Sequence, residues 1–404
     1  MTSYILSDIV GFNDIIKNDD NCNSNILKSN KRTLNKTSYK VITYDKNLLS
    51  NDLIHSYGLC RSVIINNNKV VSFAPPKSIP CDEFIKKYCE TTIGVVAEEF
   101  IEGTMINVFW DETIGLSGGW EFSTRNIVGA GTSFYKKTTA KTFREMFLEA
   151  AKENNLVLDD LEKNFCYSFV LQHPDNRIVI PFKQPQLYLV ALYLIVNKDD
   201  TVSVTAYDVN EYSRYFYNIS NSSIMFPKIY KLESYSELIE KYASMKTPYD
   251  IVGVVVHNHC TGERMKIRNP VYELVRNLKG NQSKLQYQYL CLRKEGKVGD
   301  YLKFYPENKK EFSIFRDIVH SFTNTLFVNY ISCYIKKEKP LIEFSEQYRT
   351  HMFNIHQIYK NELKEKKLFV TNKVVINFIN NLHPSLMMNC LNYEINKNVV
   401  NQDM

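Results

Sequence analysis

The sequence lacks any run of apolar residues close to the roughly 18 to 20 that a membrane-spanning helix needs. Its first ten residues, MTSYILSDIV, have neither the basic region nor the long apolar core of a secretory signal. We therefore expect an intracellular protein, located in the cytoplasm or in a virus factory. Packaging in a virion is also open.

No two cysteines form a CxxC pair. The nine cysteines are odd in number and scattered from Cys22 to Cys390, which argues against a disulfide framework or a zinc knuckle and favours a reducing compartment. No two histidines have convincing metal-ligand spacing, since His351 and His356 lie five residues apart and do not share a helix face well. The sequence therefore predicts no metal site.

The composition is that of an ordinary globular protein, with 44% hydrophobic and 23% charged residues in 404. This length suits two domains, each able to bury a core. The net charge of +6 permits a groove that attracts phosphates without requiring one. A high content of Asn, Lys, Ile and Tyr suggests an AT-rich genome, such as that of a large DNA virus.

Hydrophobic patterning predicts an α+β domain followed by an all-α domain. Short β-branched and aromatic runs between about 57 and 272 predict strands at 61–65, 69–73, 105–110, 187–196 and 251–256. One helix interrupts them, beginning at a capping box of Thr142 and Glu145.

Helical periods dominate the last third of the chain. One apolar stripe runs from Phe312 to Tyr330, a second from Tyr348 to Leu363, and a third helix opens at Thr371 and ends before Pro384. We predict an N-terminal segment (1–56) with a solvated polar loop near 17–40, a main domain (57–279) and a helical C-terminal domain (280–404). The N-terminal segment packs on the main domain or leads into it.

A series of short motifs points to a known family. The residues from Glu98 to Ile106, EEFIEGTMI, resemble the first motif K-x-[DE]-G-[ST] of nucleotidyltransferases that join nucleic-acid ends or cap RNA. Further segments resemble that family's other motifs in the right order: 60–64, 72–77, 121–125, 169–179, 252–255 and 266–272. The chain is thus similar to the phage-type (T-even) tRNA-repair RNA ligases of the ATP-dependent nucleotidyltransferase superfamily, over about half its length by motif.

This resemblance implies antiparallel sheets with helices, and it also exposes missing chemistry. The family lysine that attacks ATP falls on Phe100, whose ring offers no lone pair. Two family glutamates, which would contact ribose and help to hold a divalent metal, fall on Val170 and Val252. No catalytic residue is intact and no displaced copy of the first motif exists, so the resemblance implies a degenerate member.

The family cations that touch phosphate survive better. The candidate nucleotide- or phosphate-binding residues lie at or near family positions: Arg61, Lys77, Glu102, Arg125, Lys266 and Arg268. For Glu102, a salt-bridge role and a functional role are equally open.

Other residues favour structural interpretations. We expect His173, His257 and His259 to cap turns, and the lysines at 360, 364, 366 and 367 to form a solvated helix face, with phosphate contact as the second choice. The aromatic residues of the tail, Tyr359 among them, are core in the first instance and stacking platforms for RNA bases in the second.

Three functions remain open from the sequence. The first is a binding module for RNA, tRNA-like RNA included, or for a nucleotide, through a residual phosphate-binding cleft. The second is a scaffold in a viral particle or other assembly, with viral structural proteins as partners. The third is an active ATP-dependent RNA ligase with a relocated nucleophile such as Lys77. ATP and Mg²⁺ are cofactors only if binding or activity is retained.

Overall fold

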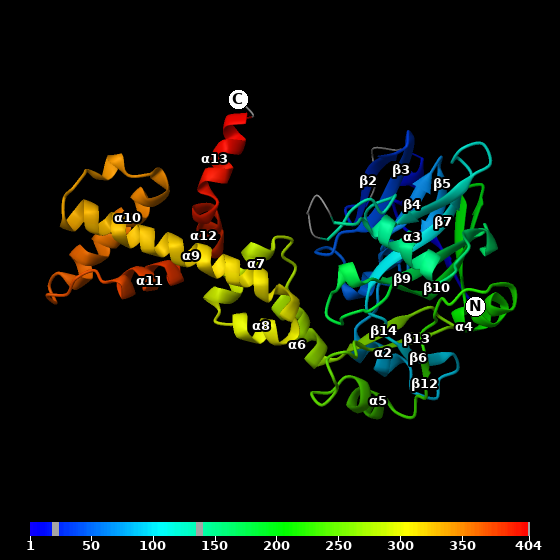
Figure 1. Cartoon of the computed structure of the whole chain (residues 1–404). Helices are drawn as coiled ribbons and strands as arrows, with labels where there is room; N and C mark the ends of the chain where they lie inside the picture. Colours follow the sequence, from blue (N-terminus) through cyan, green and yellow to red (C-terminus); the bar gives the residue numbers. More distant parts are fainter. Residues whose placement is uncertain (18–23, 135–139, 403–404) are drawn as a thin grey trace. The chain divides into compact units, whose positions relative to one another are not determined.

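The computed structural model describes residues 1–17, 24–134 and 140–402. The chain divides into two compact units, Met1–Arg276 and Asn277–Met404. Figure 1 shows that sheets fill the first unit and helices the second. The fold is therefore α+β, with an all-α C-terminal unit, as the sequence predicts.

The first unit contains three antiparallel sheets. The six-stranded sheet has the order β1 (Thr2–Ile5), β11 (Thr201–Tyr207), β10 (Gln186–Lys198), β9 (Phe165–Gln172), β7 (Thr104–Asp111) and β8 (Gly119–Ser123). A four-stranded sheet has the order β12 (Ile229–Tyr230), β6 (Val95–Glu99), β13 (Gly253–Asn258) and β14 (Arg264–Arg268). The other has the order β2 (Leu27–Leu34), β3 (Thr37–Tyr44), β4 (Val63–Asn66) and β5 (Lys69–Phe73). The five expected strands are all present.

The prediction of a solvated loop near 17–40 is wrong for the residues that the structure describes. Residues 18–23 lie outside the described part. The strands β2 and β3 form a hairpin there, closed by Asn35 and Lys36 with φ of 47° and 73°. A two-residue turn with positive φ matches the right-handed twist of the flanking strands. Most of β2 is exposed, which is why an edge strand has the composition of a loop.

The first unit has more helices than the single one expected. The helix α3 (Phe143–Glu153) does begin at the predicted capping box of Thr142 and Glu145. The additional helices are α1 (Phe12–Ile16), α2 (Cys81–Lys87), α4 (Val209–Ile219), α5 (Tyr235–Tyr242) and α6 (Pro270–Lys279). The helix α4 is rich in aromatic residues, which favour strands, but its N-cap Asp208 accepts a hydrogen bond from the Asn210 amide and fixes a helical start.

One hydrophobic core sets the orientation of the β12-β6-β13-β14 sheet. Ala97, Val254, Val256 and Met265 are fully buried on one face, in a cluster with side chains of α2 and α5. Because side chains alternate along a strand, the intervening residues point to the opposite face. That opposite face carries the residues of the site described below.

The second unit consists of helices. They are α7 (Leu285–Lys294), α8 (Val298–Phe304), α9 (Lys309–Tyr330), α10 (Glu346–Ile358), α11 (Asn372–Asn381), α12 (Pro384–Leu391) and α13 (Tyr393–Gln402). The predicted stripe of α9 is confirmed, since Phe312, Val319, Phe322, Leu326 and Tyr330 are buried. Thr371 is the N-cap residue of α11, as expected. Among the described residues, no helix combines the length and apolar character needed to span a membrane.

Candidate functional site

A cavity of about 240 Å³ lies in the first unit, on the open face of the β12-β6-β13-β14 sheet. Strands β7, β9 and β10 supply part of its wall through Met105, Val170 and Val190. Val190 sits at an irregularity in the pairing of β10 with β9, between Leu189 and Ala191. The charged residues of the lining are Arg61, Glu98, Glu99, Arg264 and Lys266.

Strand alternation explains why the cations share one face. Arg264, Lys266 and Arg268 are alternate residues of β14, and Val255 pairs with Lys266 on one side and with Glu98 on the other. Gly253 has a φ of 132°, and a Cβ there would lie 2.1 Å from the Ile267 carbonyl oxygen. Only glycine allows this close pairing of β13 with β14.

The cations in the cavity lie close together, with Arg264 buried and Arg61 and Lys266 partly buried. Burial, followed by the charges of Arg264 and Arg61, lowers the pKa of Lys266 to about 6. Burial and the neighbouring Arg264 also lower the pKa of Arg61 to about 10. In the part of the chain that the structure describes, no carboxylate lies within 4.0 Å of Arg61, Arg264 or Lys266. Such a cluster favours an anion.

Phe100, at the position of the family nucleophile, lines the cavity and packs under the cations. The Lys266 Nζ lies 4.7 Å and the Arg268 Cζ 5.8 Å from the centre of its ring. Both contacts are in the range of cation–π attraction. The ring therefore orients positive groups and supplies no nucleophile.

The two valines at family glutamate positions behave differently. Val170 lines the cavity beside Gly103, where a Cβ would lie 2.6 Å from the Val170 Cγ1. Val252 is also buried but does not line the cavity, and its carbonyl accepts a hydrogen bond from the Asn269 amide at 2.9 Å. The three apolar replacements leave the cavity open.

Three other predicted cations adjoin the cavity without lining it. Lys77 donates to the Ser78 carbonyl at 3.0 Å, and burial together with Arg61 and Arg264 lowers its pKa. The Arg125 Nε donates to the Arg61 carbonyl at 3.3 Å. Arg268 lies 3.7 Å from a Glu273 oxygen.

Glu102 has a structural position. Its buried carboxylate accepts hydrogen bonds from the backbone amides of Val179 at 2.7 Å and Ile180 at 3.1 Å. It does not line the cavity. This favours the structural alternative over the functional one.

Sequence reasoning missed Arg264 and Glu98. Arg264 is buried and its guanidinium donates to the Pro76 carbonyl, 188 residues earlier in the chain. The sequence feature that could have identified Arg264 is the alternation of Arg264, Lys266 and Arg268 in a strand that follows Gly262. Glu98 was part of the first motif but carried no family role.

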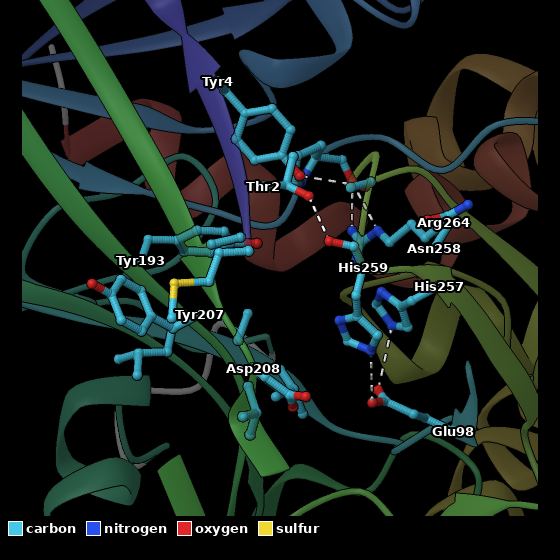
Figure 2. A pocket seen from close by; sticks show the side chains of 18 of the residues that line it. Thr2, Tyr4, Glu98, Tyr193, Tyr207, Asp208, His257, Asn258, His259 and Arg264 are labelled. Atoms are coloured by element: carbon cyan, nitrogen blue, oxygen red, sulfur yellow. Dashed lines mark hydrogen bonds and ion pairs between the residues drawn. The ribbon is translucent and has the colours of Figure 1, made fainter. Parts of the chain in front are cut away.

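A second cavity of about 300 Å³ adjoins the first, because Glu98, Val190, His257 and Arg264 line both. In Figure 2 the Glu98 carboxylate faces His257 at 3.4 Å and His259 at 4.0 Å. Burial raises the pKa of Glu98 to about 7 and is the main reason that the pKa of His257 lies well below its usual value. This cavity is less basic than the first, because Glu98, Asp208 and Glu211 line it together with Arg264.

The expected turn-capping role is wrong for His257 and confirmed for His173. His257 lies in β13, and its ring stacks on that of His259 with centres 5.8 Å apart. The His173 Nδ1 accepts a hydrogen bond from the Asp175 amide at 3.1 Å, as a capping residue does.

The described residues do not fit the divalent metal that the family implies. Outside residues 18–23, 135–139 and 403–404, no three His, Cys, Asp or Glu side chains are arranged to hold a metal ion. The family glutamate positions carry valines, which cannot coordinate metal. We therefore derive no step through a metal.

The chain is similar to the RNA ligase of Rhodothermus phage RM378, with 23% identity over 291 residues. This match spans 64% of this chain and 64% of that protein, slightly under two thirds of each. No family model matches.

Among solved structures, a putative ATP-dependent DNA ligase from Aquifex aeolicus matches with a TM-score of 0.39 and 10% identity, covering 84% of this chain and 71% of that one. A Naegleria gruberi RNA ligase mutant with ATP and Mn matches with a TM-score of 0.35 and 10% identity, covering 62% of this chain and 76% of that one. Scores this low carry no functional argument. At the level of the family, the sequence match and the antiparallel architecture make the chain RNA-ligase-like.

Proposed function

We propose that this chain is a catalytically degenerate RNA-ligase-like protein that binds a nucleotide, or the phosphates of RNA, through the 240 Å³ cavity. One observation carries the proposal. Arg61, Arg264 and Lys266 line an open cavity, and among the described residues no carboxylate lies within 4.0 Å of any of the three, although Glu98 and Glu99 also line it. The phage relative supports both the RNA-ligase-like character and a viral source.

The energetics favour an anionic ligand. Burying like charges together destabilises the protein, and the low pKa of Lys266 expresses that cost. A cluster that served only as a scaffold would be more stable with apolar residues, as at Val170. A bound phosphate offsets the repulsion by giving each cation a charged hydrogen-bond partner.

The adjoining cavity suits the rest of a nucleotide. It brings the Glu98 carboxylate and the imidazoles of His257 and His259 within reach of a base or a ribose. The buried Nε2 of His259 has no hydrogen-bond partner among the described residues. A nucleoside with donors and acceptors on its edge would supply one.

Calorimetric titration with ATP, ADP and adenosine tests this proposal. We expect ATP to bind more tightly than adenosine, with an affinity that falls as salt rises. Arg61→Met and Lys266→Met should each weaken ATP binding at least tenfold. Lys46→Met, at an exposed position of the same unit, is the matched control and should bind normally. Equal affinities for ATP and adenosine would remove the phosphate site and favour the scaffold alternative.

The loss of catalysis needs its own test. Incubation with ATP or GTP labelled at the α-phosphate, with Mg²⁺ or Mn²⁺, should leave no label that stays with the protein in denaturing gel electrophoresis, while an active RNA ligase assayed beside it is labelled. A covalent nucleotide mapped to Lys77 or to any other lysine would overturn degeneracy and support the active-ligase alternative.

A further inference from the structure

A cluster of four rings lies on the surface of the helical unit, where α9 and α10 end. The His356 ring stacks on Tyr334 with centres 3.9 Å apart and planes 14° from parallel. On Tyr359 the same ring stacks at 5.8 Å and 24°. The Tyr330 hydroxyl lies 3.4 Å from the His356 Nδ1. Tyr330 is fully buried, whereas the other three rings are partly exposed, so the cluster has an anchored base and an accessible edge.

Two π-helical segments hold these rings. The first, Ile331–Ile335, continues α9 and contains Tyr334; the second, Tyr359–Leu363, continues α10 and begins with Tyr359. A π-helical turn is rare and occurs frequently at functional sites, because it changes the direction of the side chains that follow. Here two such turns occur where α9 and α10 bring their rings together.

Lysines flank the rings on both segments. Residues 336–339 and 360–367 contain seven lysines against three glutamates. The exposed lysines that have no carboxylate within 4.0 Å among the described residues are Lys337, Lys339, Lys360, Lys364, Lys366 and Lys367, of which Lys339 lies over the ring of Phe344. Their charges are therefore available to a partner.

The two structural interpretations, a solvated lysine face and an aromatic core, do not together account for this arrangement of rings and lysines. A solvated helix face accounts for the lysines but not for partly exposed stacked rings beside them. A core accounts for Tyr330, which is fully buried, yet Tyr334, His356 and Tyr359 are partly exposed. Stacked rings flanked by unpaired lysines are the elements with which proteins bind single-stranded nucleic acids.

We propose that this surface, formed by Tyr334, His356, Tyr359 and the lysines of 336–339 and 360–367, binds single-stranded RNA. The rings stack on bases, and the lysines neutralise the phosphates on either side. The surface belongs entirely to the helical unit and is distinct from the cavity of the first unit. This inference rests on the proposed function in one respect, which is the choice of RNA as the partner.

Fluorescence anisotropy with a labelled 12-nucleotide single-stranded RNA tests the cations. On the full chain, the double variant Lys364→Glu/Lys367→Glu should weaken binding at least tenfold and reduce the dependence of affinity on salt. The matched control is Lys309→Glu/Lys310→Glu, two exposed lysines at the start of α9, about 30 Å from its other end. The control should bind within twofold of the unaltered protein.

The rings need a readout that charge alone does not change. An RNA carrying 2-aminopurine should lose fluorescence on binding as its base stacks, and Tyr359→Leu should remove this quenching while Tyr359→Phe keeps it. Circular dichroism shows whether each variant folds. Quenching that persists in a folded Tyr359→Leu protein would overturn the stacking.

The results also separate this surface from the cavity. ATP binding should be unchanged in Lys364→Glu/Lys367→Glu, and RNA binding should survive in Lys266→Met. RNA binding that is lost only in Lys266→Met would overturn the surface and leave the cavity in place. No RNA binding at low salt would overturn the surface whatever the result with ATP, and the exposed rings would then point to a protein partner.

Discussion

At the scale of single residues, the partly buried Lys266 amine lies among positive side chains. Burial is the first cause of its pKa of about 6, followed by the charges of Arg264, Arg61, Arg268 and Lys77. Its positive charge is therefore disfavoured in the folded protein unless an anion is bound. Lys266 therefore lowers the stability of the folded protein, and a bound anion offsets this loss.

Replacing Lys266 should separate stability from binding. We expect Lys266→Met, which keeps the length of the side chain and removes the amine, to raise the free energy of unfolding by about 2 kcal/mol while weakening ATP binding. Urea denaturation of both proteins at neutral pH measures the difference. Lys46→Met should leave the free energy of unfolding unchanged. A folded Lys266→Met protein that is less stable would show that the amine has a stabilising role.

Ligand binding should also take up protons. A bound phosphate favours the charged amine, so it raises the pKa of Lys266 from about 6. Glu98, with a pKa of about 7, also lowers the affinity for an anion as the pH rises, because the carboxylate that forms when its proton leaves repels the anion. ATP affinity should therefore fall between pH 6 and 8, by up to about tenfold per unit for each proton taken up. Calorimetry in buffers of different ionisation enthalpy counts these protons, and Lys266→Met should flatten the profile.

The sequence predicted part of the site because the motifs of the resembling family identify individual positions along the chain. Arg61, Phe100, Val170 and Lys266 line the cavity as the motifs imply. Arg264 could not be found this way, because its role depends on the distant Pro76 carbonyl. His257 was misassigned because neighbouring Asn258 suggested a turn, whereas pairing with β6 and β14 places it in a strand.

At the scale of elements, the pairing of β13 with β14 depends on Gly253. In Gly253→Ala the new Cβ would meet the Ile267 carbonyl oxygen at 2.1 Å, and the positive φ adds strain. We expect the free energy of unfolding to fall by about 3 kcal/mol or more, and ATP binding to be lost with the geometry of β14. Thermal unfolding with and without ATP measures both effects.

Gly299→Ala is the matched control for that change. Gly299 lies in α8, and nothing is within 4 Å of the added Cβ. Alanine should stabilise the helix by up to about 1 kcal/mol. Equal behaviour of the two variants would contradict the close approach assigned to Gly253.

Elements were predictable where local preference and tertiary pairing agree. The β-branched residues of β5 and β13 predicted these strands, and the apolar stripe of α9 predicted its helix. The hairpin of β2 and β3 was missed because β2 is exposed, so no apolar alternation reveals it. The helix α4 was missed because the strand preference of its aromatic residues opposes the helix that its cap begins.

At the scale of the whole molecule, the division at Arg276 makes the two binding surfaces physically separable. A fragment of residues 1–279 keeps α6 intact and retains the hydrophobic cores of the first unit. We expect it to fold and to bind ATP within about twofold of the full chain, because the cavity is made only by the first unit. It should lose the affinity for single-stranded RNA that we assign to the helical surface.

Circular dichroism, calorimetry with ATP and anisotropy with RNA check this prediction. A folded fragment that binds RNA as well as the full chain would move RNA binding to the first unit. The order of motifs and the change of periodicity near 280 were enough to predict an α+β domain followed by helices. They could not predict the rings of the π-helical segments, which meet only when α10 lies beside α9.

The ring of Phe100 also has an evolutionary consequence. Beneath Lys266 and Arg268 it compensates for positive charge, so a single return to lysine would add one more cation to an already repulsive group. A carboxylate at a position that lines the cavity, such as Val170, would be needed to offset such a lysine. On the proposed function, ligation would therefore need several coordinated changes, so we expect that Phe100→Lys alone does not restore it, whereas changes that refine the binding of anions need only one position at a time.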